Sequence, residues 1–153
     1  MRKIAGVVFA AAMMVPLGLV ASPAGAATGA QCTKSVGTVN LKTGVATDIL
    51  SGCTPVSATG GSGKVVTKIT SPTSTVVWAG GKGTTVVKQS TKAGPKPNKC
   101  PSGTTLLILT GTVVGGSGAA LKAIPKGQAA SDFLCLNTKT DATTLEPGTV
   151  SKY

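Results

Sequence analysis

The sequence predicts an all-β fold, an antiparallel β-sandwich of immunoglobulin-like character with about eight strands and two disulfides. Three observations support this prediction. From Cys32 onward the chain consists of short runs rich in Val and Thr. Gly, Pro, Ser and Asn separate these runs, as they do where turns join strands. No stretch has the period of a long amphipathic helix, so strands are expected to pack on strands around the core.

The densest apolar run of the chain is predicted to be the central strand of the sheet. It lies within residues 103–118 and reads Leu106-Leu107-Ile108-Leu109. Alternation places Leu106 and Ile108 on one face and Leu107 and Leu109 on the other. Because both faces are apolar, we expect the strand to be covered on both sides. The Thr and Gly content of the run argues against a transmembrane span.

The segments before this strand form a series of predicted hairpins. Val36–Asn40 and Val45–Leu50 flank a turn in which Gly44 is expected to take a positive φ. Cys53–Gly63 has the composition of a loop. Three further strands are predicted at Lys64–Thr70, Thr75–Ala79 and Thr84–Ser90. The first alternates, with Val65, Thr67 and Ile69 on one face. Trp78 in the second is expected to be a core residue, and an exposed ligand platform is the alternative.

The segments around and after the central strand are connections and shorter strands. Lys92–Gly103 contains three prolines, so it is predicted to be the longest connection and not a central strand. Ala119–Ile124 is either a short strand or one helical turn. Two more strands follow, Asp132–Asn137, with Leu134 and Leu136 on one face and Phe133 and Cys135 on the other, and Thr149–Tyr153.

Four cysteines in a chain with an export signal predict two disulfides. Three pairings are possible. We favour Cys32–Cys53 and Cys100–Cys135, because each would join neighbouring strands. A structural zinc site is the rival reading, but the chain has no Cys-x-x-Cys pair and no histidine to complete one.

The first residues have the pattern of a secretory signal peptide. Arg2 and Lys3 precede an apolar stretch, Ile4–Val20, and Ala24-Gly25-Ala26 supplies the small residues of a cleavage site. Cleavage is expected after Ala26, or after the neighbouring Ala27. The mature chain, residues 27–153, is then a single secreted domain of 127 residues that does not span a membrane.

Several features together resemble the small exported proteins of actinobacteria. They are the leader rich in Ala, Gly and Val, a Thr- and Gly-rich body whose only basic residue is lysine, and the C-terminal segments LKAIPKGQAASDFLCLN and TTLEPGTVSKY. The resemblance implies an extracellular or cell-envelope setting. It implies nothing about a catalytic site.

The composition argues against most classes of enzyme. Without histidine the chain has no Ser-His-Asp or Cys-His nucleophilic site, and no Ser-x-x-Lys occurs. The four acidic residues of the mature chain could supply a glycosidase pair, but none stands beside a recognisable aromatic sugar platform. We therefore expect a protein with no enzymatic activity and no cofactor.

The mature chain carries 13 lysines against four acids, a net charge of +9, and Thr54–Ser131 contains no acid. This balance favours an anionic wall polymer or an anionic lipid surface as partner, although lysines that only solubilise the surface are the alternative. No arginine follows residue 2, and aromatic residues are scarce, so sequence-specific recognition of nucleic acid is not expected. The candidate anion-binding residues are Lys64, Lys68, Lys88, Lys92, Lys96 and Lys99.

Two other functions stay open. A protein inhibitor would present one rigid loop, and the candidate is residues 93–102 around Cys100. A carrier of a small apolar ligand would enclose a cavity between its sheets. The sequence assigns neither the partner nor the oligomeric state.

Overall fold

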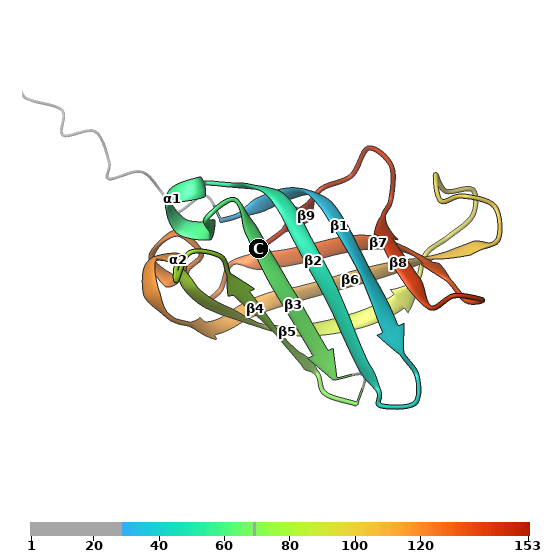
Figure 1. The fold of residues 1–153 in the computed structure, drawn as a ribbon, viewed down its shortest axis with the longest axis horizontal. Helices are drawn as coiled ribbons and strands as arrows, with labels where there is room; N and C mark the ends of the chain where they lie inside the picture. The colour runs from blue at the N-terminus through green and yellow to red at the C-terminus, as the bar shows by residue number, and fades with distance from the viewer. Residues whose placement is uncertain (1–28, 69) are drawn as a thin grey trace, which may run out of the picture.

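The computed structural model describes residues 29–68 and 70–153. This part of the chain contains nine strands and two short helices (Figure 1). The predicted signal peptide, residues 1–26, and Ile69 lie outside these described residues. The strands are β1 (Gln31–Asn40), β2 (Val45–Thr54), β3 (Ser62–Lys68), β4 (Thr73–Trp78), β5 (Gly83–Ala93), β6 (Thr104–Gly116), β7 (Ala129–Asn137), β8 (Ala142–Leu145) and β9 (Ser151–Lys152). Helix α1 (Val56–Thr59) follows β2, and helix α2 (Gly118–Ala123) follows β6.

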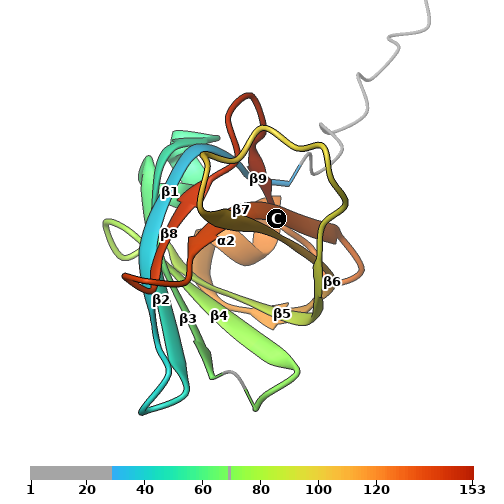
Figure 2. The ribbon, with the colours of Figure 1, turned by 90° about the vertical axis from the view of Figure 1, so that its right-hand side faces the viewer.

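The sheet closes into an antiparallel barrel. Each strand from β1 to β7 pairs with the next, and β8 pairs back onto β1 through Val36↔Thr144, Gly37↔Thr143 and Thr38↔Ala142. Figure 2 looks along the barrel and shows these eight strands as a ring, with α2 at the far end. The short β9 is an additional strand that pairs with both β1 and β7 near the start of β1.

The predicted immunoglobulin-like sandwich is therefore wrong. A sandwich has two sheets with free edges, whereas here the first and eighth strands of one sheet pair with each other. The connections also differ, because every strand of the ring lies beside its sequence neighbour and no connection crosses between sheets. Closure satisfies the backbone groups that an edge strand would leave unpaired.

Most of the predicted elements are present, and several are longer than predicted. The β1–β2 hairpin turns at Gly44, which has a φ of +65°. The predicted loop at Cys53–Gly63 contains α1, and of the two alternatives for Ala119–Ile124 the helical turn is correct. The predicted strand around Leu106–Leu109 is present as β6, the longest at 13 residues, which pairs with β5 and β7. In a closed barrel, however, every ring strand has two neighbours, so β6 is not a central strand. The sequence reading missed β8.

A core of buried side chains fills the end of the barrel that carries the two helices. Trp78, predicted to be a core residue, is 2% exposed and donates a hydrogen bond from Nε1 to Thr85 Oγ1 at 2.8 Å. Its ring meets that of Tyr153 edge to face, with the centroids 5.8 Å apart. Ile124, directly after α2, is completely buried in the same cluster as these rings. This end of the barrel is therefore closed by packed side chains.

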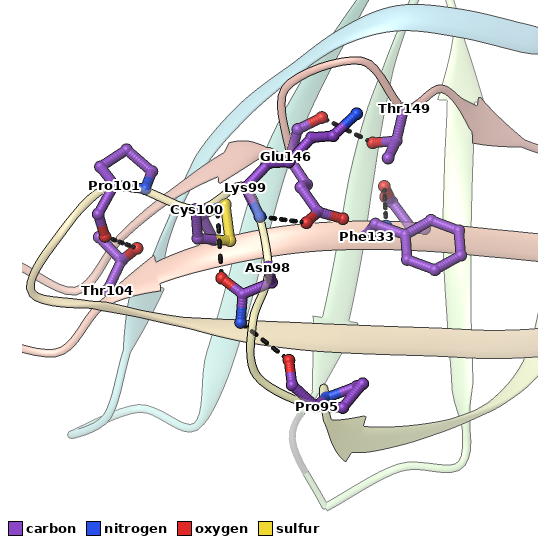
Figure 3. The surroundings of a disulfide bond; sticks show 11 residues. Pro95, Asn98, Lys99, Cys100, Pro101, Thr104, Phe133, Glu146 and Thr149 are labelled. Carbon is purple, nitrogen blue, oxygen red and sulfur yellow. Dashed lines mark hydrogen bonds between the residues drawn. A yellow bond between two sulfur atoms is a disulfide. The ribbon is translucent and has the colours of Figure 1, made fainter.

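Both predicted disulfides are confirmed. Cys32–Cys53 joins residues that face each other on β1 and β2, with the Cα atoms 4.0 Å apart. Cys100–Cys135 fastens the β5–β6 connection to β7 (Figure 3). Two disulfides indicate that the protein folds in an oxidising environment. Among the residues described, neither helix is long or apolar enough to cross a membrane.

Candidate functional site

The barrel encloses a cavity of about 210 Å³. Its walls are mainly apolar, with leucine and valine side chains from β1, β3, β5, β6 and β7. Small residues help to explain why the space is left open, because Ala46 and Ala130 also line it and carry too little side chain to fill it. Barrels of eight strands are just wide enough either to be filled by their side chains or to hold one small ligand.

Burial of the lining residues shows where the cavity meets solvent. The residues at its mouth are exposed or half-buried: Val39, Ala46, Thr67, Thr91, Leu107 and Leu136. These lie near the tip of the β1–β2 hairpin, near the ends of β3, β5 and β7 and near the start of β6, away from the helices. The residues at its floor are buried: Asp48, Val87, Ala130, Asp132, Thr143 and Tyr153. The cavity thus opens at the end of the barrel opposite the packed core.

Asp48 brings the first of two carboxyl groups to this floor. It lies on β2 between the inward-facing Ala46 and Leu50, and only 7% of it is exposed. Thr143 on β8 donates a hydrogen bond of 2.6 Å to its Oδ1. Across the β1–β2 ladder stands Gly37, where an added Cβ would clash with the carboxyl oxygen. Burial raises the pKa of Asp48, and the Thr143 hydrogen bond opposes that shift.

Asp132 on β7 supplies the second carboxyl group, and it is also 7% exposed. Its Oδ1 accepts hydrogen bonds from Ser151 Oγ at 2.9 Å and from the Phe133 backbone N–H at 3.0 Å. Burial raises the pKa of Asp132 to about 7, and the nearby charge of Asp48 adds to the shift. Tyr153 interacts with the same carboxyl, and its own pKa is raised by burial and by both aspartates.

Charge is thus separated between the inside and the outside of the barrel. No lysine lines the cavity, and every described lysine is exposed except Lys82, which is half-buried. A third acid, Glu146, is buried beneath the β5–β6 connection. Among the described residues, no group of three or more His, Cys, Asp or Glu side chains could hold a metal ion.

The predicted anion-binding lysines fall into two groups. Lys64 and Lys68 on β3, and Lys88 and Lys92 on β5, are exposed on strands that flank β4. Of these, Lys88 lies opposite Thr73 of β4, and Lys68 follows Thr67, which lies opposite Ser74 of β4. The second group, Lys96 and Lys99, lies in the β5–β6 connection, beyond β5.

The β5–β6 connection, residues 94–103, is held down at several points. Besides the disulfide, the Lys99 N–H donates to Glu146 Oε1 at 2.9 Å, as Figure 3 shows. Near its start, the Gly94 N–H donates to the Leu106 carbonyl at 2.7 Å. The segment therefore packs over the outward side of β6, where Leu106 is 5% exposed.

The sequence analysis did not identify the two interior aspartates, although the alternation of inward and outward side chains along their strands indicated them. Asp132 has the same phase as Leu134 and Leu136, and Asp48 the same phase as Leu50. Acids in phase with apolar residues point to the apolar side of a strand. Only closure of the barrel, however, brings β2 and β7 to the same interior.

No protein-family model matches this chain, and neither a curated protein nor a solved structure is similar enough to match it.

Proposed function

We propose that the protein binds a small, largely apolar ligand inside its barrel. The observation that carries this proposal is the cavity of about 210 Å³, lined mostly by apolar side chains and opening at one end. An engineered apolar cavity of about 150 Å³ is enough to bind benzene, so this one suits a molecule of roughly eight to ten non-hydrogen atoms. Concave, mainly apolar sites with a few polar groups are the usual form of small-molecule sites.

The rest of the chain is consistent with a carrier that works outside the cytoplasm. The signal peptide predicted at residues 1–26 and the resemblance to small exported proteins support secretion, and the disulfides suit that setting. The packed core around Trp78 and Tyr153 keeps one end shut and leaves the mouth as the entry. We place the protein at or near the cell envelope as a non-enzymatic binding protein.

The proposal is tested by titrating the protein with benzyl alcohol and following its amide signals by NMR. Binding should shift the signals of Leu107, Leu109 and Leu134 more than those of the outer strand surfaces. Ala46→Phe, which places a large side chain at the mouth, should weaken binding at least tenfold. The matched control Val77→Phe adds similar bulk on the outer face of β4, where Val77 is 49% exposed, and should bind as the unmodified protein does. Interior signals that do not move would contradict the proposal.

A second function is favoured by the separation of charge. Asp48, Asp132 and Glu146 are buried, so the lysines on the outside have few acids beside them. This supports the proposal that the outer surface associates reversibly with an anionic wall polymer or anionic lipid. Such association would hold a carrier at the envelope and is compatible with ligand binding in the interior.

A further inference from the structure

We propose that the ligand is a small organic amine, whose protonated nitrogen is held by Asp48 and Asp132 while its apolar body fills the cavity. This inference rests on the proposed binding of a ligand in the barrel and names its chemical class. Both carboxyl groups line the same cavity, and both lie at its buried floor. A ligand that enters through the mouth would therefore reach them with its leading end.

The carboxyl groups keep hydrogen-bonding capacity for a ligand. Asp48 is more than nine-tenths buried, and its one hydrogen bond among the described residues, from Thr143, ends on Oδ1. No hydrogen bond from the described residues ends on its Oδ2, and the Asp48 side chain lines the cavity. The hydrogen bonds that Ser151 and Phe133 donate to Asp132 also end on Oδ1, and Tyr153 is a third hydrogen-bonding neighbour of this carboxyl, so Asp48 offers the freer oxygen. An ammonium group has three donors and no acceptor, so it matches these oxygens.

Electrostatics favours a cation over a neutral or anionic head group. Taking a carboxylate out of water costs free energy unless an opposite charge pairs with it. Among residues 29–68 and 70–153, no basic side chain lines the cavity to provide that charge. Burial and the proximity of the two acids raise the pKa of Asp132 to about 7, which shows how poorly the unpaired charge is tolerated. A bound ammonium would relieve this penalty, whereas a carboxylate ligand would increase it.

The apolar walls favour an organic cation over a metal ion. A calcium ion takes six to eight oxygen ligands, and magnesium also requires a full oxygen shell. Besides the two carboxyl groups, the lining contains four threonines, Gln89, Ser131 and Tyr153, but its surface is mainly apolar and does not resemble such a shell. Apolar walls instead gain free energy by burying hydrocarbon. The combination matches an amine attached to a compact aliphatic or aromatic body.

The test compares three probes that share one ring and differ in the head group: benzylamine, benzyl alcohol and benzoate. At about pH 8, where Asp132 is mainly ionised, benzylamine should bind the full protein at least tenfold more tightly than benzyl alcohol, and benzoate should bind most weakly. The double substitution Asp48→Asn and Asp132→Asn should remove the preference for benzylamine over benzyl alcohol. Glu146→Gln, a buried acid outside the cavity, is the matched control and should keep the preference.

Lowering the pH adds an independent readout. The titratable groups that face Asp132 are Asp48 from β2 and Tyr153 beyond β9, and burial favours the neutral form of all three. Below about pH 7, Asp132 must release a proton before it can pair with the ammonium, so the apparent affinity for benzylamine should fall up to tenfold per pH unit. Binding of benzyl alcohol should change little.

The outcomes separate the two proposals. Benzyl alcohol or benzoate binding as tightly as benzylamine would overturn the amine assignment and leave ligand binding standing. A benzylamine preference that survives the double substitution would also overturn it. Interior NMR signals that respond to none of the three probes would contradict ligand binding itself, and the amine assignment with it.

Discussion

Asp132 shows at the scale of one residue how the barrel changes ordinary side-chain chemistry. On a solvated strand its carboxyl would ionise near pH 4. On the floor of the cavity, burial raises its pKa to about 7, and three protein hydrogen-bonding groups recover only part of the lost hydration. The proton that this group holds between pH 4 and pH 7 links the stability of the fold to pH.

The stability of the protein is expected to fall as pH rises from about 4 to about 7. In that window the folded state keeps a proton on Asp132 that the unfolded chain has released, since the pKa is about 7 when folded and 3.8 when unfolded. This one group would change the free energy of unfolding by on the order of 4 kcal/mol, and the raised pKa of Asp48 acts in the same direction. Urea unfolding at a series of pH values measures the slope.

Asp132→Asn supplies the comparison. The variant has no proton to lose at this position, so its stability should depend less on pH and should exceed that of the unmodified protein at about pH 8. Asp141→Asn, in the turn before β8, changes the same charge outside the cavity and should keep the original slope. Identical slopes for the unmodified protein and for Asp132→Asn would refute the assignment of the raised pKa.

At the scale of one element, the two apolar faces of strand β6 meet different parts of the molecule. Leu107 and Leu109 face the cavity. Leu106 points outward and is buried beneath the β5–β6 connection, close to Gly94. The expectation of a strand covered on both sides is met at Leu106, which lies beneath the proline-rich connection. It is not met at Leu107 and Leu109, which are half-buried and border the open cavity.

This arrangement predicts unequal effects of alanine along β6. Leu106→Ala should lower the free energy of unfolding by about 2–5 kcal/mol, because it removes a fully packed side chain and leaves a void. Leu107→Ala should be milder, because Leu107 is half-buried and already borders open space. Chemical denaturation of both variants measures the difference, and a larger loss for Leu107→Ala would contradict the assigned faces.

The connection itself should depend on its disulfide. Replacing Cys100 and Cys135 by alanine opens a loop of sequence separation 35 and should lower stability by about 3–4 kcal/mol. It should also speed amide hydrogen exchange across residues 94–103. The comparison variant, with Cys32 and Cys53 replaced, removes a bridge between strands that are already paired and should leave exchange in this connection unchanged. Equal exchange in both variants would show that the disulfide does not hold the connection.

At the scale of the whole molecule, the barrel divides the charges of the chain between two environments. Two acids face the cavity and a third is buried beneath the β5–β6 connection, while the lysines are spread over the outer surface. An outer surface with so few acids should have a positive electrostatic potential that attracts anionic surfaces. Salt should screen this attraction over about 8 Å at physiological ionic strength.

Co-sedimentation with phosphatidylglycerol-containing vesicles or purified anionic wall polymer should therefore show binding that weakens steeply with added salt. Replacing Lys92, Lys96 and Lys99 by Gln should weaken it more than the same charge change at Lys34, Lys122 and Lys152 on β1, α2 and β9. If the protein does not bind even at low salt, the proposed association is refuted and the lysines only keep the surface soluble. Binding unaffected by salt would refute the electrostatic explanation.

Local patterns in the sequence determined the all-β class, most of the strands and both disulfides. Alternation of Val and Thr positions, the glycine in the β1–β2 turn and the prolines between Lys92 and Gly103 act over a few residues, so they can be read along the chain. The cysteine pairing followed because Cys32 and Cys53 flank a predicted hairpin. Charge and composition also predicted a lysine-covered surface.

The tertiary structure alone decided that the sheet closes and what it encloses. Whether β1 pairs with β8 depends on the accumulated twist and tilt of the whole sheet, which no local pattern encodes. Closure turned the inward faces of β2 and β7 toward one space and so brought Asp48 and Asp132 together across 84 residues of sequence. The cavity arises where small inward residues fail to fill that space, and a void is a property of the packed whole.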